Sequence, residues 1–263
     1  MTNKYLSRGD APIEAGTWET LDRTMLEAAR SVLSGRRLLH IDGPYGLGLK
    51  VVTMSDPEVK SAPVTSPVIP LALISRSFTV AKRDLAAFER DGTMLDIEPV
   101  ATAAIECAAL EDELVFKGTK DTHGLLTTKG CNHLKLSPWD EVGTAAEDII
   151  KAVTALDSSG FHGPYCLALA PKRFNLLLRR YPNGNISELE HTKTMVTEGI
   201  FKAPVLESGG ILLASGRQYA SIVLGQDMAI GFIGPAGERL EFSISESLTP
   251  FVRQPKAICL LEG

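Results

Sequence analysis

The clearest pattern of apolar and polar positions in the chain covers residues 96–118 and predicts a long helix. Asp96 can cap this helix, Pro99 suits its first turn, and Gly118 supplies its stop. About 19 residues would span roughly 28 Å, so this helix can serve as a spine for other elements. Apolar residues recur at the spacing of one helix face, at Val100, Ala103, Ala104, Cys107, Leu110 and Leu114.

Shorter patterns predict further helices and many strands, which together indicate an α+β fold. In the first of these helices Trp18, Leu21 and Met25 share one face, and Gly35 ends it. Ser137 and Pro138 suit the start of the second helix. The predicted helices cover residues 17–34, 137–160, 171–181 and 186–198, and the predicted strands cover residues 38–41, 163–170, 210–214, 219–224, 229–233, 239–245 and 257–261.

Residues 49–79 predict a long extended arm. Prolines at positions 57, 63, 67 and 70 forbid a helix. A long segment without helix is uncommon in a compact monomer, so pairing with another subunit is the favoured interpretation. The alternative is a plain surface loop, but the segment is too apolar to lie comfortably in water. Its apolar residues include Val64, Val68, Ile69, Leu71, Leu73 and Ile74.

Composition narrows the class of protein. The 263 residues carry a formal net charge of −5, which disfavours a general nucleic-acid binder. No secretory signal and no apolar run long enough for a membrane span is present. The four cysteines are widely spaced and lack a Cys-x-x-Cys pair, which is typical of reduced thiols in a cytoplasmic protein. A covalent pair among them remains an open alternative.

No local motif indicates catalysis or a bound metal. The glycine-rich residues 43–48 resemble a phosphate loop, but no helix follows them, so a structural turn is favoured. Glu188 and His191 form a single Glu-x-x-His where di-iron bundles need two. Residues 123–133 offer Cys131 and two histidines without standard zinc spacing. A dispersed Ser/His/Asp triad leaves no sequence signature, so that possibility stays open.

Three consecutive acids, residues 111–113, point around the predicted spine helix rather than converging. We therefore expect them to be solvated or to form ion pairs between subunits. Without a catalytic constellation, the residues favour an assembly protein over an enzyme.

Motifs spread over nearly the whole chain then resemble one known family. They include Leu110-Glu-Asp-Glu-Leu-Val-Phe-Lys-Gly118 and Leu224-Gly-Gln-Asp-Met-Ala-Ile-Gly231. Others are Gly35-Arg-Arg37, Ile41-Asp-Gly-Pro-Tyr-Gly46 and Gly163-Pro-Tyr165. In order and coverage the chain is similar to the encapsulins, nanocompartment shell proteins with the HK97 phage-capsid fold.

This resemblance implies a domain plan. The N-terminal helix and the start of the peripheral (P) domain would occupy residues 1–48, and the E-loop, an extended arm, residues 49–78. The P domain would continue over residues 79–136 with its spine helix at 97–117. The axial (A) domain would occupy residues 137–214, and the returning P-domain strands residues 215–263.

The resemblance also implies partners. We expect the chain to pair with itself in an icosahedral shell, the simplest being a T=1 particle of sixty subunits. The cargo of such shells is typically a dye-decolourising peroxidase or a ferritin-like iron oxidase, docked by a C-terminal targeting peptide. No nucleic-acid or membrane partner is expected. No cofactor is expected either, and flavin in particular is not, since Arg83 stands where some members carry a flavin-stacking tryptophan.

Two sites follow from the same resemblance. The cargo-peptide groove would use Met25, Ala28, Ala29, Val32, His40, Ile41, Ile230 and Phe232. The five-fold pore would use Tyr181, Asn183, Gly184, Asn185, Glu188 and Glu190, and would be neutral to acidic. Two other classes stay open as alternatives: a protease or bacteriocin-type enzyme, and a true phage major capsid protein.

Overall fold

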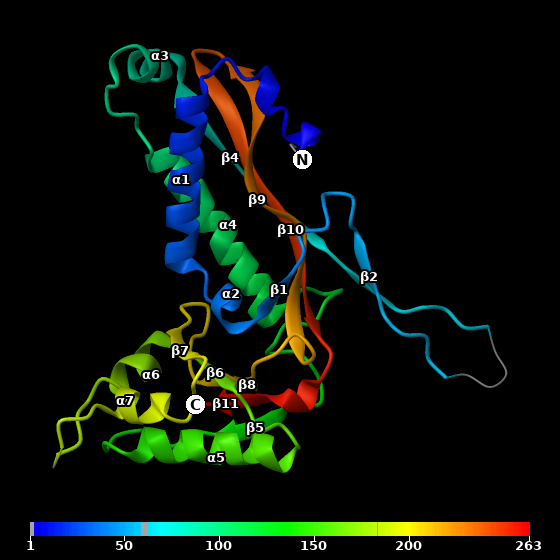
Figure 1. Cartoon of the computed structure of the whole chain (residues 1–263), viewed down its shortest axis with the longest axis vertical. Helices are drawn as coiled ribbons and strands as arrows, with labels where there is room; N and C mark the ends of the chain where they lie inside the picture. The colour runs from blue at the N-terminus through cyan, green and yellow to red at the C-terminus, as the bar shows by residue number, and fades with distance from the viewer. Residues whose placement is uncertain (1–2, 59–62, 183) are drawn as a thin grey trace. The chain divides into compact units, whose positions relative to one another are not determined.

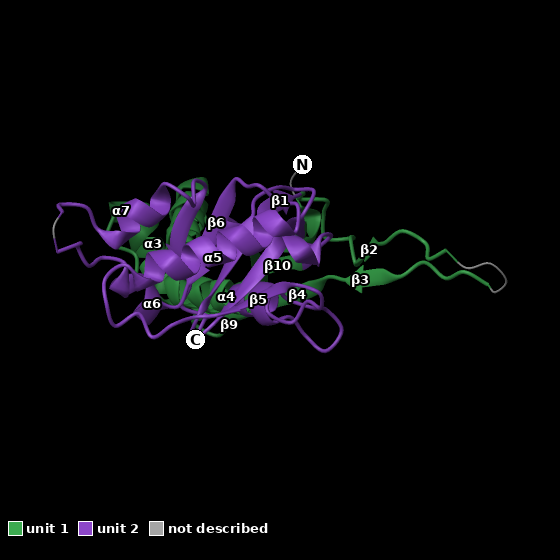
Figure 2. Ribbon diagram, turned by 90° about the horizontal axis from the view of Figure 1, so that it is seen from below, with its two compact units in different colours: residues 1–33, 43–111, 224–249 green, residues 34–42, 112–223, 250–263 purple. Residues whose placement is uncertain are grey.

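The computed structural model describes residues 3–58, 63–182 and 184–263. The chain divides into two compact units (Figure 2). It passes between them inside α4 (Glu98–Lys117), β9 (Ala220–Ala236) and β10 (Arg239–Val252). Unit 1 comprises Met1–Leu33, Gly43–Glu111 and Leu224–Thr249, and unit 2 comprises Ser34–Asp42, Asp112–Val223 and Pro250–Gly263.

Unit 1 is built around the long antiparallel strands and two helices, α1 (Ala15–Val32) and α4, that lie along them (Figure 1). Alternate residues are buried over the first half of β10, from Leu240 to Glu246, as expected for a strand with one face against a core. Phe242 is fully buried in this face. Its ring centroid lies 5.7 Å from that of Trp18 on α1, 5.4 Å from Phe78 and 5.6 Å from Phe232. This aromatic group joins helix and sheet in unit 1.

The predicted spine helix is confirmed as α4. Of its predicted apolar face, Leu110 is half-buried and the other five residues are buried. Helix α4 begins at Glu98, and the Asp96 carboxylate, two residues before it, accepts a hydrogen bond from the Glu98 N–H at 3.1 Å, which satisfies one free donor of the first turn. Small side chains allow close approach, and the Cys107 thiol reaches the Ile244 carbonyl of β10 at 3.7 Å.

The extended arm is a two-stranded ribbon of β2 (Val51–Thr53) and β3 (Val68–Pro70), which projects from unit 1 (Figure 1). The predicted limit of the arm at residues 78–79 is wrong. Strand β4 (Ala72–Ala81) pairs antiparallel with β10 along its whole length, from Ala72↔Leu248 to Ala81↔Arg239. Burial of Ile74 and Phe78 draws β4 into the sheet, so the arm ends near Pro70.

Unit 2 contains a five-stranded sheet in the order β5-β11-β8-β6-β7. Every residue of β6 and β8 is buried, which agrees with the continuous apolar runs that predicted them. Helix α5 packs against the sheet over Ile149, Ala152 and Leu156. The elements are α2 (Gly35–Leu38), β1 (His40–Asp42), β5 (Asn132–Lys135), α5 (Thr144–Ser158), β6 (Tyr165–Leu169), α6 (Pro171–Leu176), α7 (Glu188–Lys193), β7 (Gly199–Lys202), β8 (Gly210–Ala214) and β11 (Ile258–Glu262).

Several predicted boundaries differ from the structure. Gly35 was predicted to end the first helix, but α1 ends at Val32 with Leu33 as its C-cap, and Gly35 is the first residue of α2. The two strands expected at 219–224 and 229–233 form one long strand, β9, because the polar residues between them are accommodated in the sheet. Helix α3 (Lys82–Asp91) has no predicted counterpart, since it is strongly charged and buries only Leu85. The short helices α6 and α7 are shorter than expected.

Helix α5 begins at Thr144 and not at Ser137 as predicted. The Ser137 N–H and hydroxyl both donate to Asp148 Oδ2, each at 2.7 Å. The buried Trp139 ring donates to the same oxygen at 3.0 Å. Asp148 therefore folds the segment before the helix back onto α5, and this segment cannot be helical.

The interpretation of residues 111–113 as outward-facing acids is wrong for two of the three. Glu111 and Asp112 are buried, at 0% and 2% exposure. Asp112 accepts hydrogen bonds from the Ser34 N–H, the Ser34 hydroxyl and the Gly35 N–H at 2.5–3.2 Å. It thereby satisfies backbone donors at the start of α2. Only Glu113 faces solvent, 3.4 Å from Lys117.

Over the described part of the chain, no helix combines the length and the apolarity needed to cross a membrane.

We expect Asp112→Asn to lower the free energy of unfolding by about 2 kcal/mol, because it removes the charge from a buried set of hydrogen bonds. The adjacent variant Glu113→Gln is a matched control. Its ion pair is exposed and contributes about 0.3–0.5 kcal/mol. Denaturant unfolding of both variants measures the difference, and equal losses would contradict the assigned role of Asp112.

Asp148 makes stability depend on pH. Burial raises its pKa, but hydrogen bonds from Lys151, Ser137 and Trp139 outweigh burial and lower the pKa to about 2. Since an unfolded Asp has a pKa of about 3.9, this stabilisation is complete above pH 4. It is lost as the pH falls from about 4 through 2.

Asp148→Asn should therefore flatten the dependence of the unfolding free energy on pH between about 4 and 2. Unfolding at a series of pH values checks this. Asp140→Asn, at an exposed position in the same segment, is the control. A slope that is unchanged in the Asp148 variant would contradict the assignment.

Candidate functional site

The residues predicted to form the cargo groove fall in both units. In unit 1, Met25, Ala29 and Ile230 are buried in the core, at 3%, 4% and 0% exposure. Three others in unit 1 are half-buried and keep surface for contact: Ala28, Val32 and Phe232. In unit 2, His40 is exposed and Ile41 is half-buried, both on β1. The groove remains a prediction, and its accessible part in unit 1 is limited to those three half-buried residues.

The N-terminal segment occupies the neighbourhood of the predicted groove strand. The Asn3 side chain donates to Gln226 Oε1 of β9 at 2.6 Å. A Cβ at Gly231, between Ile230 and Phe232, would lie only 3.1 Å from the Leu6 carbonyl oxygen. The backbone of residue 6 therefore passes directly over β9, which sequence patterns did not indicate.

Arg8 fastens this segment to α1. Its guanidinium contacts both Asp22 carboxylate oxygens, at 3.1 and 2.7 Å, and lies over the Trp18 ring at 4.0 Å from its centroid. Two parallel hydrogen bonds and a cation–π contact make a rigid attachment. Any ligand at this end of β9 meets an ordered N-terminal segment.

The predicted pore loop is a narrow turn that precedes α7 in unit 2. Its two arms join where the Tyr181 N–H donates to the Ile186 carbonyl at 3.2 Å. Gly184 and Asn185 are exposed, and Asn183 lies outside the described residues. Gly184 and Asn185 are therefore accessible in unit 2.

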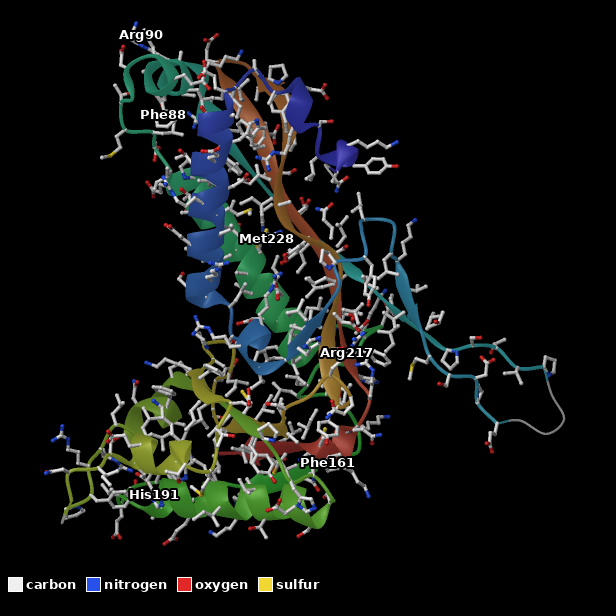
Figure 3. All side chains as sticks on the ribbon, in the orientation of Figure 1. Phe88, Arg90, Phe161, His191, Arg217 and Met228 are labelled. Carbon is white, nitrogen blue, oxygen red and sulfur yellow. The ribbon has the colours of Figure 1, made fainter. Side chains whose placement is uncertain are left out.

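A capping box sets the start of α7. Ser187 Oγ accepts from the Glu190 N–H, and Glu190 Oε2 accepts from the Ser187 N–H at 2.7 Å. The backbone N–H of Ser187 lowers the pKa of the exposed Glu190 carboxyl, so this acid is ionised at neutral pH. Glu190 also borders a cavity of about 580 Å³ with Tyr181 and His191, whose Oη and Nδ1 atoms lie 2.8 Å apart. His191 is labelled in Figure 3.

Glu188 is placed differently from the sequence prediction, which had it facing passing ions. It is fully buried, and its Oε1 accepts hydrogen bonds from the Gly143 N–H at 2.9 Å and the Ala146 N–H at 3.0 Å. Its Oε2 lies 3.6 Å from the Arg179 guanidinium. A carboxylate at this position caps the N-terminus of α5. Of the two candidate pore acids, only Glu190 is accessible in the chain.

The remaining candidate chemistry is structural. Backbone N–H groups of the glycine-rich loop form hydrogen bonds with β9, and the Tyr45 N–H donates to the Leu224 carbonyl at 3.0 Å. His133 Nδ1 lies 2.7 Å from a Glu262 oxygen. All four cysteines are free thiols, and burial raises the pKa of Cys107 to about 12. Within residues 3–58, 63–182 and 184–263, no three His, Cys, Asp or Glu side chains gather as a metal site.

Comparison with known proteins gives a consistent result. The family model described as encapsulating protein for peroxidase matches residues 2–249. The type 1 encapsulin shell protein EncA of Myxococcus xanthus is 28% identical over 98% of this chain and 96% of its own length. A ferritin-like-encapsulin shell fusion protein of Pyrococcus furiosus is 31% identical over 73% of this chain and 53% of its own length.

Solved structures agree on the fold. The crystal structure of a virus-like particle from Pyrococcus furiosus superposes with a TM-score of 0.76 and 25% identity, covering 94% of this chain and 99% of that one. The capsid of Myoviridae phage XM1 superposes with a TM-score of 0.60 at 14% identity, covering 85% and 89%. The predicted HK97-like capsid fold is thus confirmed.

Proposed function

Because the chain belongs to the encapsulin family, whose members are shell proteins that assemble into capsid-like particles around cargo proteins, we propose that it forms a T=1 icosahedral shell of sixty subunits. The observation that carries this proposal is the match in fold and length to a virus-like particle, over 94% of the chain. Its role in the family is structural. The phage capsid shares the fold, but the family match favours a nanocompartment.

We assign the β2–β3 arm to contacts between subunits. A two-stranded ribbon alone is at best marginally stable in water. This ribbon also exposes apolar side chains, among them Val51 at 41%, Met54 at 41% and Val68 at 50%. Burial of these residues against a neighbouring copy would recover their hydrophobic free energy and order the ribbon. In this scheme the arm is the E-loop of the shell.

The cargo is proposed to be a peroxidase or a ferritin-like enzyme. The family description names a peroxidase, and a relative carries a ferritin-like domain fused to its shell domain. The cargo would dock through a C-terminal peptide on the half-buried residues Ala28, Val32 and Phe232. Small ions would reach it through a five-fold pore formed by residues 181–190, with Glu190 as its accessible acid.

Electron microscopy of the protein expressed alone is the direct test of assembly. We expect uniform hollow spheres from the wild-type chain. Val68→Asp should yield mainly small oligomers, because each copy would bury an unpaired charge at the arm contact. Val68→Thr keeps the side-chain shape and should still give shells.

Closed shells from the Val68→Asp variant would contradict the role assigned to the arm. Small oligomers from the wild-type chain would contradict the shell itself.

The pore proposal predicts that the two acids of the loop differ. Glu190→Lys should slow the entry of a divalent or trivalent cation by roughly three- to tenfold, because it reverses a charge beside the path. Glu188→Gln should leave entry unchanged but lower the unfolding midpoint, because it weakens the cap on α5. Terbium luminescence of shells loaded with a chelating cargo measures entry.

Glu238→Lys, an exposed acid in the β9–β10 turn, is the control for the change in net charge. If the Glu190 and Glu238 variants slowed cation entry equally, the assignment of Glu190 to the pore would be contradicted.

A further inference from the structure

Unit 2 contains a polar cavity at one end of its five-stranded sheet, away from the loop that precedes α7. Its volume is about 370 Å³. Four segments of unit 2 meet there: the α2–β1 junction, the start of β6, the residue before β7 and the turn that follows β8. They contribute Arg37, His40, Cys166, Glu198, Gly216 and Arg217 to the lining. No motif in the sequence brought these residues together.

Arg217 is held in position by Asp42. Its Nη2 donates to Asp42 Oδ1 at 3.0 Å, and Asp42 is only 9% exposed. The Arg217 side chain itself is 62% exposed (labelled in Figure 3). Among the residues that the structure describes, this is the one hydrogen bond of its side chain, and it leaves Nε and Nη1 as donors. The remaining N–H donors of the Arg217 guanidinium can therefore form hydrogen bonds with an oxyanion.

Arg253 fixes the turn that carries Arg217. Its Nη1 donates to the Arg217 carbonyl at 3.1 Å and to the Ser221 hydroxyl at 2.8 Å. Its Nη2 lies 3.7 Å from Asp42 Oδ2. Two guanidinium groups thus share one carboxylate, and the cluster of Asp42, Arg217 and Arg253 keeps a positive charge. The arrangement is built before any ligand arrives.

The charges on the lining favour an anion. Arg37 and Arg217 are always protonated, and the His40 ring can supply a further N–H donor. Glu198 is the one acid among the lining residues described, and its side chain is exposed, so it can turn toward solvent. Cys166 is buried, and burial raises the pKa of its thiol to about 12, so it adds no second negative charge.

We propose that this cavity binds a phosphate group, with Arg217 as its principal donor and Arg37 as a second arginine in the lining. Guanidinium forks match the planar pairs of oxygens on phosphate. The cavity is larger than a phosphate ion alone, so inorganic phosphate and a small phosphomonoester are both suitable sources. The proposal does not depend on the shell function, since all of its residues belong to unit 2 of one chain.

Isothermal titration of the purified, desalted protein with inorganic phosphate tests this site, in whatever assembly the protein adopts. Arg217→Gln and Arg37→Gln should each weaken binding by about tenfold, because each removes charge-assisted hydrogen bonds. Arg239→Gln is the matched control, since Arg239 is an exposed arginine that contacts Thr79 in unit 1. Circular dichroism establishes that each variant is folded.

A parallel titration with adenosine monophosphate distinguishes the sources. Tighter binding than that of phosphate, lost in both cavity variants, would assign the site to a phosphomonoester. Equal or weaker binding would assign it to the free ion. Absence of binding of both compounds to the wild-type protein, or equal weakening in the Arg239 variant, would overturn the proposal.

Discussion

A buried carboxylate must have hydrogen-bond donors, and unit 2 meets this constraint at three places with backbone N–H groups. Asp112 binds the start of α2, Asp148 binds the segment before α5, and Glu188 binds the first turn of α5. Each removes unpaired donors that would be costly in a core. Each also joins segments distant in sequence, up to 78 residues apart for Asp112 and Ser34. The helix positions of unit 2 depend on these charges.

The same constraint governs which acids are available for function. Glu188 and Glu190 are two residues apart on α7, and the capping box at Ser187 sets the rotation of this helix. That rotation turns Glu188 inward to α5 and leaves Glu190 at the surface. Because Glu188 is buried in the cap of α5, it cannot also serve a passing ion, so the accessible charge of the loop is smaller than its composition indicates.

Unit 1 relies on apolar packing instead. Phe242 holds α1 and β4 together through ring contacts, while the β2–β3 ribbon leaves Val51 and Val68 exposed. Unit 1 thus has a buried aromatic core and, beside it, a ribbon whose apolar side chains are exposed. This arrangement is expected of a subunit whose arm becomes buried only in an assembly. The family to which the chain belongs consists of shell proteins.

The sequence by itself determined the spine helix, the apolar extended arm and the buried strands β6 and β8. These depend on local periodicity and on proline positions, which act within a few residues. The order of the motifs along the chain was also enough to identify the family. Only the tertiary structure decided that Asp112 is a cap, that Ser137 does not begin α5, and that β4 belongs to the sheet. It also brought Arg37 and Arg217 to one cavity. The physical reason is that burial, pairing and capping depend on partners tens of residues away, which no local pattern records.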